Sequence, residues 1–85
     1  MAASSDWRIE LTSGAEKSLK RLSKPDRNRL RAAIDTLPVG DIKKLRGRSN
    51  QFRLRVGEFR VVFAPDYTAR RVVILEVFHR GSGYR

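Results

Sequence analysis

The feature that most constrains the fold of this chain is an alternating run of residues on both sides of a glycine. Its apolar residues occupy every second position, namely Phe52, Leu54 and Val56 before Gly57-Glu58, then Phe59, Val61 and Phe63. A period of two is typical of strands that bury one face. A Gly-X pair between two such strands favours a two-residue type II′ turn. The sequence therefore predicts a β-hairpin over residues 52–63.

The two-residue turn also fixes which residues lie opposite each other. The expected pairs are Val56 with Phe59, Arg55 with Arg60, Leu54 with Val61, and Phe52 with Phe63. Arg53, Arg55 and Arg60 then share the face that the apolar residues leave. Like charges at opposed positions disfavour folding, so either a phosphate lies between Arg55 and Arg60 or both side chains spread into water. The third charge, on Arg53, favours the phosphate.

Two helices are predicted before the hairpin. Ser13 and Glu16 have the spacing of a capping box, and the helical stripe after Ser13 comprises Ala15, Leu19 and Leu22. Pro25 suits the first turn of a second helix. The stripe of that helix comprises Leu30, Ala33, Ile34 and Leu37, and Pro38 and Gly40 end it. A break this short predicts a helical hairpin.

Two further strands and one loop complete the expected elements. Trp7–Thr12 alternates like a half-buried strand. Arg71–Phe78 is almost continuously apolar, which indicates a central strand buried on both faces. We expect Asp41–Gln51 to be a loop, and its basic residues are Lys43, Lys44, Arg46 and Arg48.

The order β-α-α-β-β-β predicts an α+β fold. In this fold the helical hairpin packs on one face of a small, twisted, mostly antiparallel sheet, within a single domain of residues 1–85. The other face of the sheet stays open and carries the arginines of the hairpin. His79, Arg80 and Tyr84 follow the central strand and could curl over the same face.

The charge of the chain agrees with a polyanion as the partner of that face. Nineteen Lys and Arg residues stand against nine Asp and Glu residues, which gives a net charge of +10. Such a field attracts polyanions at long range, and arginine suits forked contacts with phosphate. A merely soluble basic domain, a ribosomal protein or a membrane-surface protein would also have this composition.

Several other classes of protein are excluded or disfavoured. The chain has no cysteine, so it can form neither a disulfide nor a thiolate zinc site. Its Asp and Glu residues form no recognisable ligand cluster, and we expect no metal and no other cofactor. No apolar run approaches the roughly 20 residues of a membrane span. Met1–Asp6 lacks the basic start and apolar core of a secretory signal, so we expect a cytoplasmic protein without a membrane contact.

The chain resembles the RelE/ParE toxin superfamily in three stretches. These are Lys44-Leu45-Arg46-Gly47, the hairpin Phe52–Phe63, and His79-Arg80 with Tyr84. The order of the expected elements matches across nearly the whole chain. The resemblance implies the toxin of a type II toxin–antitoxin system, of the RelE kind that cuts mRNA in the ribosomal A site and inhibits translation.

The resemblance also implies roles for individual residues. Arg60 and Arg80 would stabilise phosphate and act as acid–base groups, while Arg53 and Arg55 would hold the substrate and help to activate the nucleophile. Tyr84 would stack on a base or act as the general base, and Arg46 would contact the substrate or the ribosome. We assign Arg60, Arg80, Tyr84 and Arg55 to catalysis, and the remaining basic residues of the site to RNA binding: Arg53, Lys43, Lys44, Arg46, Arg48 and His79.

The chemistry of RNA makes a reaction without a metal reasonable. RNA supplies its own nucleophile, the 2′-hydroxyl, so cleavage needs a base near that group and cations around the phosphorane. The expected product is a 2′,3′-cyclic phosphate or its opened 3′-phosphate. Arginines are poor acids and bases, so a ribosome that orients the codon would contribute much of the rate.

The resemblance implies a cognate antitoxin whose segment orders on binding, with operator DNA contacted only through that antitoxin. Two other functions stay open. One is inhibition of DNA gyrase without nuclease activity, as in the ParE branch, and the other is RNA binding without catalysis.

Overall fold

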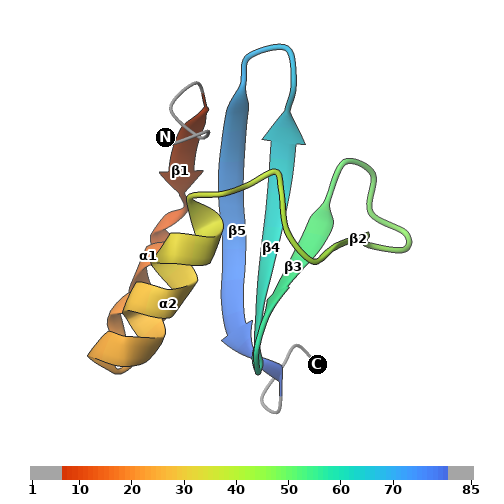
Figure 1. Cartoon of the computed structure of the whole chain (residues 1–85). Coiled ribbons are helices and arrows are strands. Elements are labelled where there is room, and N and C mark those ends of the chain that lie inside the picture. Colours follow the sequence, from red (N-terminus) through yellow and green to blue (C-terminus); the bar gives the residue numbers. More distant parts are fainter. Residues whose placement is uncertain (1–6, 81–85) are drawn as a thin grey trace.

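The structure, a computed structural model, describes residues 7–80 as two helices on one five-stranded sheet (Figure 1). In chain order the elements are β1 (Arg8–Leu11), α1 (Ser13–Lys20), α2 (Lys24–Ile34), β2 (Ile42–Lys44), β3 (Phe52–Val56), β4 (Phe59–Asp66) and β5 (Arg71–His79). The strand order is β1-β5-β4-β3-β2. β1 runs parallel to β5, and the other neighbours are antiparallel, so the predicted α+β class is confirmed. Neither helix in these residues is long and apolar enough to cross a membrane.

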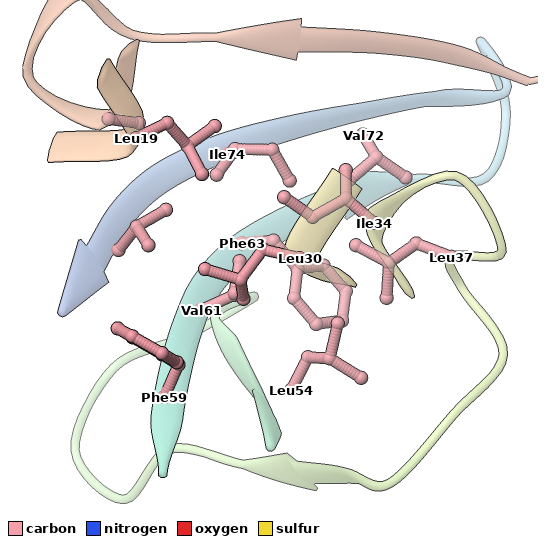
Figure 2. Close-up of a cluster of buried hydrophobic side chains, with 12 residues drawn as sticks. Leu19, Leu30, Ile34, Leu37, Leu54, Phe59, Val61, Phe63, Val72 and Ile74 are labelled. Atoms are coloured by element: carbon pink, nitrogen blue, oxygen red, sulfur yellow. The ribbon is translucent and has the colours of Figure 1, made fainter. Parts of the chain in front are cut away.

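The helices cover one face of the sheet, and the core lies between the two layers (Figure 2). Leu30 and Ile34 of α2 meet Leu54 and Phe63 of the hairpin, and each of these four side chains is at most 3% exposed. Full burial of a side chain of this size contributes about 1.5–3 kcal/mol. The apolar stripes of the two helices and of the hairpin therefore hold the layers together, as their periodicity predicts.

The predicted hairpin is confirmed in every pair. Val56 lies opposite Phe59, and Arg55 lies opposite Arg60. Gly57 has a φ of +57°, whereas Glu58 has no positive φ. This combination fits a type II′ turn, in which only the first central residue needs the left-handed region.

The prediction of a continuous loop over Asp41–Gln51 is wrong at its start. Ile42–Lys44 forms β2, which pairs with β3 so that Ile42 lies opposite Leu54 and Lys43 opposite Arg53. A strand of three residues is too short to show an alternating pattern, and β2 contributes a single apolar side chain. The sheet therefore has one more strand than the sequence predicts.

The predicted capping box of Ser13 and Glu16 is wrong, and the helix begins one residue earlier with a single side-chain cap. The N-cap of α1 is Thr12, not Ser13, and its side chain accepts a hydrogen bond from the backbone N–H of Ala15 at 3.1 Å. The same hydroxyl donates to the carbonyl of Leu75 in β5, also at 3.1 Å. Thr12 thus joins the start of the helix to the sheet.

Leu75 is the extra residue of a β-bulge. Phe63 pairs with Ile74, but Val62 pairs with Glu76, which leaves Leu75 without a partner in β4. The bulge changes the phase of the strand, so Ile74 and Val77 face the helices while Glu76 and Phe78 face away. The predicted central strand is thus an interior strand, but it is fully buried on one face only, because Val73 and Phe78 are half-buried.

We expect Thr12→Ala to lower the free energy of unfolding by about 1–2 kcal/mol, because it removes both the cap and the bond to the bulge. Urea denaturation measures the change. Thr12→Ser keeps the hydroxyl and is expected to retain most of the stability. Equal losses in the two variants would show that the hydroxyl contributes nothing.

Candidate functional site

The sheet face that points away from the helices carries two rows of residues, which follow from the strand register. The first row crosses from β2 to β5 through Lys43, Arg53, Val62 and Glu76. The second row contains Arg55, Arg60 and Phe78. We call these seven residues the open face. It brings together four of the basic residues that the sequence predicts for the site.

Arg53 and Arg60 are the two most enclosed cations of the open face. Both residues are half-buried. Val62, which lies opposite Arg53 and two residues from Arg60 on β4, is only 1% exposed although no helix covers it. The neighbouring side chains must therefore cover Val62. The Nε of Arg53 is buried and has no hydrogen-bond partner among the described residues. Within residues 7–80 neither arginine forms an ion pair, so the positive charge of both is available to an anion.

The like-charged pair of Arg55 and Arg60 is relieved inside the chain. The Nε of Arg55 donates to the Asp41 carboxylate at 2.9 Å. One terminal nitrogen of Arg60 donates to the carbonyls of Gly57 at 3.2 Å and Phe59 at 3.0 Å. The two guanidinium groups are therefore drawn to different partners, and a phosphate between them is not needed to explain the pair.

The β3–β4 turn gathers the arginines of the site. Arg60 bonds to carbonyls of this turn, as described, and the Arg80 backbone N–H donates to the Glu58 carbonyl at 2.7 Å. The Arg80 side chain also pairs with the Glu58 carboxylate at 3.4 Å. The guanidinium of Arg29 from α2 lies beside Gly57, so that a Cβ there would be 3.5 Å from its Nη2. Arg60 and Arg80, far apart in the sequence, thus lie at one turn.

The other predicted RNA-binding residues are distributed more widely. Arg48 of the β2–β3 loop reaches the Glu76 carboxylate at 3.7 Å and therefore approaches the open face. Lys44 lies opposite Phe52 and so belongs to the helix side of the sheet. Arg46 is exposed in the β2–β3 loop. These two residues are not brought to the open face.

His79 lies on the other side of the sheet from the arginines of the open face. It pairs with Phe59, and its ring meets the Phe59 ring edge-on with the centroids 5.3 Å apart. Since Phe59 faces the helices, His79 lies on the helix side of the sheet. Tyr84, which the sequence assigns to catalysis, lies outside the described residues.

The sequence reasoning missed Glu76. This residue places a carboxylate, 43% exposed, among the cations of the open face. A strict period of two from Val72 onward would direct Glu76 toward the helices, and only the bulge at Leu75 turns it outward. No signal in the single sequence marks that bulge.

The described part of the chain shows no site for a metal ion, since no three His, Asp or Glu side chains gather there. The open face instead offers guanidinium groups at different depths, with one carboxylate among them. Such a set can hold a phosphodiester and stabilise added negative charge on it.

Comparisons with known proteins agree with one another. The family model described as "ParE toxin of type II toxin-antitoxin system, parDE" matches residues 9–84. A protein of Methanocaldococcus jannaschii that carries the name toxin RelE1 is 27% identical over an alignment 86 residues long, and the alignment covers 93% of this chain and 96% of that protein. The archaeal RelE-RelB complex from Pyrococcus horikoshii OT3 matches with a TM-score of 0.73 and 25% identity, over 92% of this chain and 99% of that chain. The RelBE2 toxin-antitoxin complex from Mycobacterium tuberculosis matches with a TM-score of 0.74 and 26% identity, over 87% of this chain and 98% of that chain.

We expect Gly57→Ala to destabilise the protein by about 1–3 kcal/mol, because the turn that gathers Arg60 and Arg80 needs a positive φ at this position. Thermal unfolding of the purified protein measures the effect. Gly14 in α1 has no positive φ, and a Cβ there would make only an ordinary contact, 4.0 Å from the Thr12 Oγ1. Gly14→Ala is therefore the matched control and should be neutral or slightly stabilising. A neutral Gly57→Ala would contradict the turn assignment.

Proposed function

Because this chain belongs to the family of ParE toxins of type II toxin–antitoxin systems, we propose that it is a RelE-like toxin that cuts mRNA in the ribosomal A site. Cleavage there inhibits translation. The relatives reported above carry RelE or RelBE in their names, which supports the RelE branch of the superfamily. We further propose that it acts in the cytoplasm, where the ribosome and mRNA are found.

The observation that carries this proposal is the convergence of Arg60 and Arg80 on one turn beside the open face. A nuclease needs cations on more than one side of a single phosphate, because the phosphorane carries more negative charge than the phosphodiester. Arg53 on β3 adds a half-buried cation on the strand next to that of Arg60. Charges that are partly withdrawn from water act on an anion more strongly than fully exposed ones.

In the proposed reaction these residues hold and stabilise the substrate. Arg53 and Arg60 bind the scissile phosphate and stabilise it as the 2′-oxygen adds, while Arg55 and Arg80 exchange their carboxylate partners for phosphate oxygens. An exposed ion pair contributes at most about 1 kcal/mol, so this exchange has a low cost.

The flanking RNA or the ribosome is held by three basic residues, Lys43, Arg48 and Arg46. Lys44 and His79 lie on the helix side and could contact only RNA that extends past the sheet. Tyr84 stacks on a base or accepts a proton, as the resemblance implies.

We also propose a cognate antitoxin as the partner that silences the toxin. The two structural relatives are complexes of a toxin with its antitoxin. A chain with a net charge of +10 would bind an acidic or amphipathic segment, and operator DNA would be reached only through the antitoxin.

Inhibition of DNA gyrase is the second candidate function. It is supported by the matched family model, whose description names ParE. It would use the same fold as a binding surface, without a role for a cation set around a phosphate. The gathering of Arg53, Arg60 and Arg80 favours the nuclease.

We expect Arg60→Ala and Arg80→Ala each to slow A-site cleavage at least about 100-fold, because each removes a cation from the phosphorane. Growth arrest after induction should be relieved in parallel. Mapping of mRNA 5′ ends in a translating extract measures the cleavage. Arg31→Ala, which removes an exposed charge from α2, is the matched control and should cut normally.

Two results would contradict the proposal. Full cleavage by a variant that lacks both Arg60 and Arg80 would refute the site assignment. Intact mRNA together with inhibited supercoiling at low toxin concentration would favour gyrase as the target.

A further inference from the structure

Metal-free cleavage of RNA needs an acceptor for the proton of the 2′-hydroxyl, and the arginines of the open face cannot supply one. Resting on the function proposed above, we infer that Glu76 is the general base of this reaction. Glu76 lies on β5, the strand that pairs with β4 of the arginine hairpin.

The bulge at Leu75 places Glu76 within the cation set. Glu76 is opposite Val62, the covered residue that lies opposite Arg53 and two residues from Arg60. Arg60 pairs with Phe78, so Arg60 and Glu76 are diagonal neighbours on the same face. Diagonal neighbours lie about 7–8 Å apart at their Cα atoms, within reach of long side chains. A phosphodiester held by Arg53 and Arg60 would therefore lie beside the Glu76 carboxylate.

The other carboxylates near the site are less suitable as bases. Asp41 is held by the Arg55 Nε at 2.9 Å, and Glu58 by Arg80 at 3.4 Å. Glu76 meets Arg48 only at 3.7 Å, beyond hydrogen-bonding distance, so its oxygens can still accept a proton. Its side chain is 43% exposed, compared with 53% for Asp41 and 61% for Glu58. Glu76 thus combines the greatest enclosure with the weakest internal contact.

In this reaction the Glu76 carboxylate takes the proton of the 2′-hydroxyl. The 2′-oxygen forms a bond to phosphorus, and the bond from phosphorus to the 5′-oxygen breaks with its electron pair on that oxygen. The 5′-oxygen then takes a proton from water, and the resulting hydroxide accepts the proton from Glu76. The products are a 2′,3′-cyclic phosphate and a 5′-hydroxyl. With this assignment Tyr84 keeps the stacking role.

The test compares Glu76→Gln with the unchanged chain on ribosomes programmed with mRNA. We expect cleavage to slow by about 100-fold or more, since a general base contributes 10²–10⁴-fold. Binding to ribosomes that carry mRNA with a 2′-deoxy residue at the cut position should be weakened less than threefold. Glu76→Asp keeps a carboxylate and should retain more activity than Glu76→Gln.

Two further measurements separate a base from a residue that only holds Arg48. Arg48→Ala removes the same ion pair but leaves the carboxylate, so its rate should still fall toward acidic pH, as in the unchanged chain. Glu76→Gln should lack that fall. The charged groups that face Glu76 are Arg48, Arg53 and Arg60, with Lys43 at the far end of its row. All four are Arg or Lys residues, a class of side chain that titrates only at alkaline pH, so an acidic limb points to a carboxylate.

The outcomes distinguish the two proposals. Cleavage by Glu76→Gln within threefold of the unchanged chain would overturn Glu76 as the base and leave the nuclease function intact. An equal loss of cleavage rate in Glu76→Gln and Arg48→Ala, with the pH dependence of Glu76→Gln unaltered, would do the same. If the unchanged chain leaves mRNA intact, the proposed function fails, and the assignment of Glu76 fails with it.

Discussion

The position of Glu76 and Phe78 on the open face depends on one irregularity, the extra residue Leu75 in β5. Leu75 has no residue opposite it in β4, and its carbonyl accepts a hydrogen bond from the hydroxyl of Thr12, which also caps α1. A buried or half-buried carbonyl without a partner would be costly. The single threonine therefore stabilises the bulge and the start of the helix together. Beyond the bulge, Val77 enters the core while Glu76 and Phe78 turn to the arginine side, so the same residue sets both the core packing and the composition of the open face.

Contacts within the chain offset the repulsion between the cations of this face when no ligand is bound. Arg48, Arg55 and Arg80 each meet a carboxylate from another strand, loop or turn, whereas Arg60 is held by carbonyls. The three ion pairs are exposed and weak. They reduce repulsion in the free protein, yet a phosphate can replace them at low cost. Arg53 and Arg60 lack such ion pairs among the described residues, so an anion is expected to bind them most strongly.

Sequence reasoning succeeded where periodicity and turn chemistry act over several residues. The register from Phe52 to Phe63 followed from two-residue alternation and one glycine, and the order of the helices followed from their apolar stripes. It failed where a feature depends on a single residue, as the cap and the bulge do, or on a strand of only three residues, as β2 does. β2 is too short to alternate, the cap moved from Ser13 to Thr12 because of a contact with a distant strand, and the bulge left no local signal. The sequence therefore predicted that the arginines of the hairpin share a face, but it did not predict that Glu76 lies on that face. His79 was expected near the arginines and lies on the helix side, because the same bulge reverses its direction.

The central claim is that the open face, and not the helix side, binds an RNA phosphodiester. The most direct test is NMR of the arginine Nε–H groups in ¹⁵N-labelled protein during titration with a short RNA whose riboses are 2′-O-methylated and so cannot be cut. The predicted result is that the signals of Arg53, Arg60 and Arg80 shift first and that added salt reverses the shifts. Contradiction would come from leading shifts at Arg21 and Arg31 of the helical hairpin, or from equal shifts at all arginines.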